Sequence, residues 1–253
     1  MKRTLWIGLL VCTTQLWAQS VIPDGTILPV RLNSSLNSGK VKAGRVITAR
    51  VAQDVPLSAG AKIHAGAKVI GHVTEVKSRR PAQLSIRFDT LVISGRRIPV
   101  TTNLRALAST MAVEEAQVPQ TGPDRGTPEN AWNTEQIGGE VVYRGGGPVA
   151  AGLQTVGEPV PNGVLVHVSG KPGTECQGEI EGNDRLQALW VFSSDACGAY
   201  GFADLAITHA GRSTPVGEVT LESEHGSVNV RAGSGMLLRV DGKTLTGSAQ
   251  GPS

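Results

Sequence analysis

Hydrophobic and polar residues alternate through most of the first hundred residues of the chain. In residues 82–90, AQLSIRFDT, the side chains of Leu84, Ile86 and Phe88 would share one face, with polar side chains on the other. A period of two residues is the signature of a half-buried β-strand. The same alternation, bounded by Gly, Pro or Ser, recurs in residues 44–54, 67–77 and 96–102. Short strands at this spacing predict a barrel or a sandwich.

A short repeat marks the start of several predicted strands. It consists of an apolar residue, any residue, Ala or Asp, Gly, and a small residue. It occurs in residues 22–28, 63–69 and 230–236. A turn that needs a positive φ admits glycine at low cost, so Gly25, Gly66 and Gly233 are predicted turn residues. Because the third copy lies near the end of the chain, we expect residues 216–245 to complete the sheet that residues 21–103 begin, which predicts an all-β fold built on a distorted β-barrel.

The middle of the chain departs from this pattern. Leu104, Leu107 and Met111 recur at helical spacing and predict one short α-helix, which a proline-rich linker follows. The strand-like residues beyond the linker predict a β subdomain inserted into the barrel. The predicted order along the chain is a first barrel segment (19–103), helix (104–117), linker (118–130), inserted β subdomain (131–214), a second barrel segment (215–245) and a flexible tail (246–253).

The first eighteen residues have the features of a secretory signal peptide. Lys2 and Arg3 precede an apolar run, and Ala18 provides a small residue at a cleavage site. We therefore expect export, with the mature protein in the periplasm or associated with the outer membrane. Cleavage would leave 235 residues with 22 basic and 21 acidic side chains, a near-neutral balance that argues against nucleic acid as a partner. No later segment is long and apolar enough to predict a transmembrane helix.

Export also decides the interpretation of the cysteines. Removal of the signal peptide removes Cys12 and leaves Cys176 and Cys197 in an oxidising compartment, which favours one disulfide between them. The alternatives for Cys197 are a nucleophile or a metal ligand. Both need a nearby base or further ligands, and the adjacent Asp195 disfavours a reactive thiolate.

No arrangement of catalytic or metal-binding residues stands out. The five histidines are scattered, at His64, His72, His167, His209 and His225, without the spacing of a zinc site. Ser193 and His209 could join an Asp in a hydrolytic triad, but no G-x-S-x-G elbow accompanies them. Gly145–Gly147 could cradle a phosphate, but Pro148 and a predicted strand follow where a helix is needed. We therefore predict no catalytic site, no metal and no cofactor.

Aromatic residues near Cys197 offer a second interpretation. Trp190 and Phe192 alternate in a predicted strand and would share one face, which is typical of a core. Tyr200 and Trp132 are less constrained and are the candidate contacts for a glycan or a peptide.

Three segments together resemble a known family. They are residues 22–55 (IPDGTILPVRLNSSLNSGKVKAGRVITARVAQDV), 63–77 (IHAGAKVIGHVTEVK) and 82–100 (AQLSIRFDTLVISGRRIPV), and residues 228–240 (VNVRAGSGMLLRV) resemble the closing strand. The pattern is similar to the C-terminal β-barrel domain of TrbI-type conjugation proteins, the barrel subunits of the type IV secretion core complex. The matching positions are Gly25, Thr26, Arg50, Val51, Asp54, Val55, Gly66, Gly71, Gly95 and Arg96, while His64 replaces the usual proline. The resemblance implies a barrel in which Gly71 is a further structural turn glycine, and it covers about 110 residues.

These observations predict an exported, non-enzymatic scaffold or interaction protein of the cell envelope, related to a secretion or conjugation apparatus. Its partners would be envelope proteins or further copies of the chain. The alternative is a periplasmic module that binds a glycan or peptide through the inserted subdomain, and a hydrolase is a third hypothesis.

Overall fold

The computed structural model describes residues 22–119, 133–143, 147–168, 170 and 182–242. The predicted signal peptide, most of the predicted linker and the predicted tail lie outside these residues. Trp132 and Cys176 lie outside them as well.

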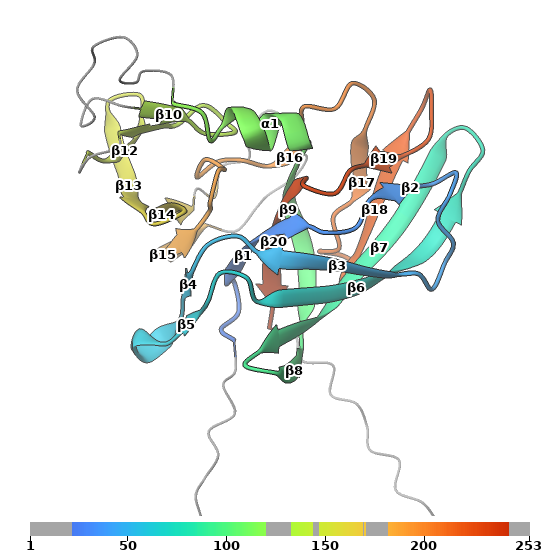
Figure 1. Ribbon diagram of the computed structural model, residues 1–253, viewed down its shortest axis with the longest axis horizontal. Coiled ribbons are helices and arrows are strands. Elements are labelled where there is room, and N and C mark those ends of the chain that lie inside the picture. Colours follow the sequence, from blue (N-terminus) through green and yellow to red (C-terminus); the bar gives the residue numbers. More distant parts are fainter. Residues whose placement is uncertain (1–21, 120–132, 144–146, 169, 171–181, 243–253) are drawn as a thin grey trace, which may run out of the picture.

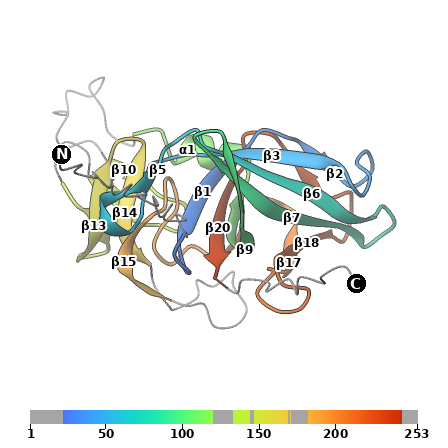
Figure 2. The same ribbon diagram turned by 90° about the horizontal axis from the view of Figure 1, so that it is seen from below.

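The larger of two main sheets contains ten strands and confirms an all-β fold. Its strands, in spatial order, are β16 (Gly198–Tyr200), β9 (Thr101–Ala108), β20 (Gly235–Asp241), β1 (Ile27–Leu32), β3 (Val46–Val51), β6 (Lys68–Lys77), β7 (Ala82–Ile93), β18 (Glu218–Ser223) and β17 (Ala206–His209), with β8 (Arg96–Pro99) paired to β7. All pairs are antiparallel except β16 with β9. The sheet is strongly curved (Figures 1 and 2), and near its open edges the N–H of Leu104 donates to the carbonyl of Ala210 at 2.8 Å. A closed barrel is not found in the described part of the chain.

The second main sheet is a six-stranded antiparallel meander. It contains β10 (Asn133–Glu135), β11 (Val141–Tyr143), β12 (Val149–Ala151), β13 (Gln154–Val160), β14 (Gly163–Val168) and β15 (Asn183–Ala188). Two small pairs complete the strands: β2 (Leu36–Asn37) with β19 (Asn229–Val230), and β4 (Val55–Pro56) with β5 (Lys62–Ile63), which the short 3-10 helix Ser58–Gly60 connects. Figure 1 shows the six-stranded sheet to one side of the curved sheet, with the helix α1 (Thr110–Glu115) above their junction.

The prediction of a helix over residues 104–117 is wrong for its first residues. Residues up to Ala108 belong to β9, and α1 has six residues, beginning after the N-cap Ser109, whose Oγ accepts the N–H of Ala112 at 3.2 Å. The helical spacing of Leu104 and Leu107 has a different cause. In the register of β9 with β20, Leu104 pairs with Leu238 and Ala106 with Leu237, so one extra residue lies between them. This β-bulge puts residues three apart on the same face of a strand.

The predicted end of the inserted subdomain at residue 214 is also wrong. β16 and β17 pair with β9 and β18 of the curved sheet, so only the strands from β10 to β15 form the separate sheet. Alternation along a strand shows that one face is buried, but it carries no information about which sheet the strand joins.

Five strands of the curved sheet open with the same turn. Before β1, β3, β6, β18 and β20, a glycine with φ between 76° and 95° is followed by a residue whose N–H bonds the carbonyl three residues back. These glycines are Gly25, Gly44, Gly66, Gly217 and Gly233. The sequence repeat identified three of the five copies. Gly71 differs, because it lies inside β6 without a positive φ, and a Cβ there would collide with the carbonyl oxygen of Arg87. Its role is to allow close approach of β7 and not to form a turn.

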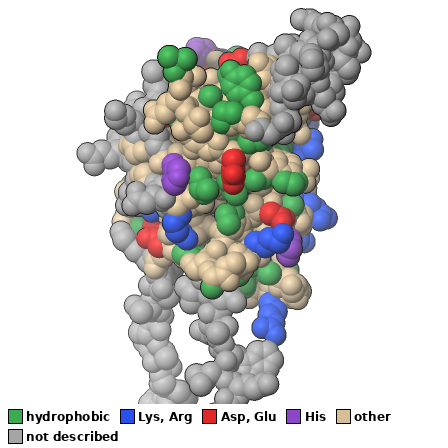
Figure 3. Space-filling model, turned by 90° about the vertical axis from the view of Figure 1, so that its left-hand side faces the viewer, with side chains coloured by type: hydrophobic (Ala, Val, Ile, Leu, Met, Phe, Trp, Pro, Cys, Tyr) green, Lys and Arg blue, Asp and Glu red, His purple; other side chains and the backbone are tan. Residues whose placement is uncertain are grey.

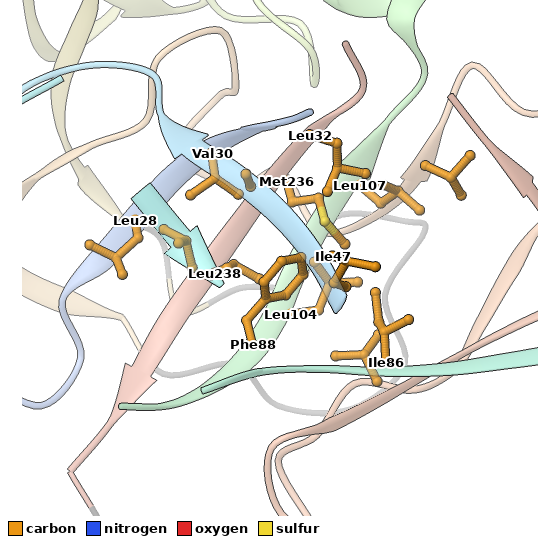
Figure 4. Packing of buried hydrophobic residues seen from close by; sticks show 14 of the residues in the cluster. Leu28, Val30, Leu32, Ile47, Ile86, Phe88, Leu104, Leu107, Met236 and Leu238 are labelled. Carbon is orange, nitrogen blue, oxygen red and sulfur yellow. The ribbon is translucent and has the colours of Figure 1, made fainter. Parts of the chain in front are cut away.

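Two hydrophobic cores result from this arrangement. The first fills the concave side of the curved sheet, where Leu28, Phe88, Leu104 and Met236 converge from four strands (Figure 4). The second lies between the two sheets. It joins Ile27, Ala106, Ala108 and Leu237 of the curved sheet to a row of valines on the six-stranded sheet, together with Trp190 and Phe192. The junction between the sheets is therefore a packed interior.

Candidate functional site

Two buried glutamine side chains join the sheets by hydrogen bonds. Gln53, just beyond β3, is fully buried; its Nε2 donates to the carbonyl of Val164 at 2.6 Å. Its Oε1 accepts the N–H groups of Val164 and Trp190, at 3.2 and 2.7 Å. In the opposite direction, Gln187 on β15 accepts the N–H of Ile27 at 3.0 Å. Buried polar groups are tolerated when their hydrogen bonds are made, and here those bonds fix one sheet against the other.

An open groove of about 940 Å³ follows this junction, and we call it the junction groove. It is lined by β1 and β3, by the turns that precede β6 and β20, and by the hairpin between β13 and β14. Trp190 and Val191 also line it, as does Gln117 after α1. Segments far apart in the sequence thus form one concave surface, the usual form of a ligand site.

Two arginines dominate the charge of the junction groove. Arg31 on β1 and Arg50 on β3 are direct cross-strand neighbours, and both are exposed. Neither forms an ion pair with any carboxylate in the described part of the chain. Like charges directly opposite each other on a sheet destabilise it. The pair is therefore unfavourable in the protein alone and would be relieved by an anion.

The other side of the groove is formed by the turn at Asn162 and by Trp190 and Val191. Trp190 has φ of 56°, a value that residues other than glycine adopt rarely, whereas φ of 63° at Asn162 is usual for an asparagine that follows proline in a tight turn. Two hydrogen bonds hold the backbone of Trp190. Its N–H donates to Oε1 of Gln53, and its carbonyl oxygen accepts a hydrogen bond from Nε2 of Gln136 at 3.1 Å. Strained backbone persists where surrounding contacts over-determine it, and such residues cluster at functional sites.

A buried polar network fixes residues 193–197. Arg105, the bulge residue of β9, is 3% exposed and donates from Nε to the carbonyl of Ala196 at 3.0 Å and from Nη2 to that of Ser194 at 2.8 Å. Burial lowers the pKa of Arg105 to about 10. Glu140 accepts hydrogen bonds from the N–H and the hydroxyl of Ser194, and burial raises the pKa of its carboxyl group. This network shapes the loop, and it lies beneath the surface.

The residues of the predicted triad are not brought together. Ser193 is fully buried and its Oγ donates to Asp195 at 2.7 Å. The ring nitrogens of His209 lie instead 2.6 Å from the carbonyl of Glu218 and 3.2 Å from Oγ of Ser213.

The predicted ligand contacts and the disulfide have different outcomes. Cys197 is buried, but Cys176 lies outside the described residues, so their disulfide stays a prediction, as does a contact by Trp132. Tyr200 is half-buried, and its hydroxyl donates to the carbonyl of Cys197 and accepts its N–H, both at 3.0 Å. Trp190 and Phe192 are buried as a core interpretation requires, although the chain turns at these residues and β15 has already ended.

Arg31, Gln53 and Asn162 were not singled out from the sequence, and Arg50 was used only as one position of a family pattern. Arginine at the polar position of an alternating strand is ordinary, and only the register of β1 with β3 reveals the pair. Pro161 and Asn162 between two apolar segments are a turn signal in the sequence, and the structure places a two-residue hairpin loop there.

Comparison with known proteins adds no family. A scan against protein-family models finds no match, and a search of curated proteins finds none at a significant level. Within the described residues, no helix is both long and apolar enough to cross a membrane. The same residues contain no group of three His, Cys, Asp or Glu side chains that could hold a metal ion.

Proposed function

We propose that this protein is an exported interaction module of the cell envelope, which binds a partner in the junction groove without catalysing a reaction. The observation that carries the proposal is the groove itself: a concave surface built from both sheets, whose walls are fixed in advance by Gln53 and Gln187. A site that is already ordered loses little conformational entropy when a partner binds. Rigid walls are therefore favourable for recognition.

The curved sheet would serve as the scaffold, as a distorted barrel of the TrbI type. The turns that carry the family resemblance open its strands, and the hydrogen bond from Leu104 to Ala210 draws its two edges together. A relationship to a secretion or conjugation apparatus is included in this proposal and rests on that resemblance. Edges of such a sheet can also pair with a strand of another chain.

Two observations make an aromatic glycan-binding platform less favourable than a protein partner. The hydroxyl of Tyr200 is used within its own loop, and Trp190 is 7% exposed and so offers little ring surface. On the face shown in Figure 3, the described residues carry hydrophobic, acidic and basic side chains interspersed, without a concentration of one charge. The groove is the better candidate for recognition.

Site-specific photo-cross-linking in cells tests this function. A photoreactive amino acid at Asn162, which lines the groove and is exposed, should give a defined adduct with an envelope protein or with a second copy of the chain. The matched control is Leu153, which is fully exposed on the turn between β12 and β13 and does not line the groove. Equal labelling at the two positions, or none at Asn162, would contradict the proposal. N-terminal sequencing of the exported protein should begin at Gln19.

A further inference from the structure

We propose that the junction groove recognises carboxylates, and that its occupant is an extended, acidic segment of a partner polypeptide. This inference rests on the proposed function and names the chemistry of the partner. Four observations carry it. They are the arginine pair, the ion pairs and hydrogen bonds that nearby acidic residues form with other groups, the amide side chains on the groove walls, and the small exposed area of aromatic rings.

The arginine pair is placed to bind carboxylates. Arg31 and Arg50 lie opposite each other on adjacent strands, so both guanidinium groups project from one face of the curved sheet. Nη2 of Arg31 lies against the turn at Gly233, only 3.6 Å from where a Cβ of that glycine would stand. A guanidinium group presents a planar fork of donors that matches a carboxylate. Two such groups side by side suit two acidic residues, or one carboxylate held from both sides.

The acidic residues closest in sequence to this pair are already engaged. Asp54 forms an ion pair with Lys62 at 2.6 Å and accepts the N–H of Ala65 at 2.9 Å. Asp24 accepts the N–H of Gly242 at 2.9 Å and lies 3.9 Å from Arg239. Neither carboxylate forms an ion pair with Arg31 or Arg50, so both guanidinium groups remain available to an added carboxylate.

The rest of the groove favours a polypeptide over other anions. Three exposed side chains on its walls, Asn33, Gln117 and Asn162, can donate to and accept from a peptide backbone. The apolar residues between them, including Val51 and Val191, are buried and leave little apolar surface exposed, so the arginine and amide side chains would make most of the contacts. A volume of about 940 Å³ lies at the upper end of ordinary ligand pockets, enough for several residues of an extended chain. None of the described residues that line the groove is a lysine, whereas nucleic-acid sites are typically rich in both lysine and arginine.

Fluorescence anisotropy of a labelled peptide tests the inference with the purified exported protein. The probe is a ten-residue peptide of alternating Glu and Ser, and its matched control has Gln in place of Glu. We expect saturable binding of the Glu peptide that weakens as salt is raised, and at least tenfold weaker binding of the Gln peptide. The double variant Arg31→Gln/Arg50→Gln should reduce affinity for the Glu peptide at least tenfold.

A second double variant controls for net charge. Arg79→Gln/Arg97→Gln removes the same two charges from exposed positions outside the groove and should bind the Glu peptide as the wild type does. Circular dichroism melts of both variants check that the fold is retained. If both double variants lose the same affinity, or if neither does, the groove is not the carboxylate site and the inference is overturned.

Competition separates the alternative ligands. Polyphosphate or a peptidoglycan fragment that displaces the peptide more effectively than free Glu peptide does would replace the inference with another anion. The outcome also separates this inference from the proposed function. An adduct at Asn162 with no binding of the Glu peptide would leave an interaction module with a different partner chemistry, whereas binding of the peptide without any cellular adduct would contradict the proposed function alone.

Discussion

Replacing Gln53 with alanine should cost the protein a large share of its stability. The amide makes three hydrogen bonds, to the carbonyl and N–H of Val164 and to the N–H of Trp190, and all three partners are backbone groups of buried residues. Leaving a buried polar group unpaired costs about 1–3 kcal/mol, so the Gln53→Ala change should lower the free energy of unfolding by about 3–5 kcal/mol. Domains are typically stable by about 5–15 kcal/mol in total.

Urea denaturation followed by tryptophan fluorescence and circular dichroism measures this difference. The matched control is Gln83→Ala on β7, where a partly exposed glutamine bonds the side chains of Lys77 and Glu222 at the surface. Water can replace those bonds, so we expect a loss below about 1 kcal/mol. If Gln53→Ala shifted the unfolding midpoint no further than Gln83→Ala, Gln53 would not be the structural link between the two sheets.

Single residues give three further predictions. Gly71→Ala should destabilise by about 2–3 kcal/mol in urea denaturation, because the new Cβ would collide with backbone of β7, whereas Gly226→Ala has room for a Cβ and should change stability by less than about 0.5 kcal/mol. Glu140 has a raised pKa when folded, so its stabilisation is complete below its unfolded pKa and declines as the pH rises through the folded value; the wild type should lose stability relative to Glu140→Gln in unfolding midpoints measured from pH 4 to pH 8. Asp204 shows the opposite sign, since hydrogen bonds from the N–H of His225 and the hydroxyl of Ser223 lower its pKa to about 2. Its stabilisation is present above pH 3.8 and lost as the pH falls toward 2, so Asp204→Asn and wild type should converge in acid unfolding.

The strands of the curved sheet could be predicted because each has one face in the core. Leu84, Ile86 and Phe88 alternate in the sequence and are all buried in the structure. The strand-opening turns could also be predicted from the sequence, because a positive φ at the third residue of the turn favours glycine there. Both signals are local, and they do not depend on which strand is the neighbour.

Features that depend on neighbours were missed or misread. The spacing of Leu104 and Leu107 is that of a helix, and only the pairing with β20 shows that Arg105 is an extra residue in a strand. Gln53 follows a strand with nothing to mark it as buried, because its partners lie more than a hundred residues away. The arginine pair likewise arises from register and not from any motif.

The shape of the groove depends on small residues on the outer face of the curved sheet. Ala106 and Ala108 on β9 leave room for the inserted segment, and Gly235 on β20 lies so close that a Cβ there would stand 3.1 Å from Cζ3 of Trp190. The ring therefore rests directly on the sheet, while the backbone above it is bonded to Gln53 on one side and to Gln136 on the other. A larger residue at Gly235 would lift the ring and strain both bonds. The left-handed backbone of Trp190 thus follows from packing below and hydrogen bonds above, so the arginines of β1 and β3 face a wall that cannot easily move.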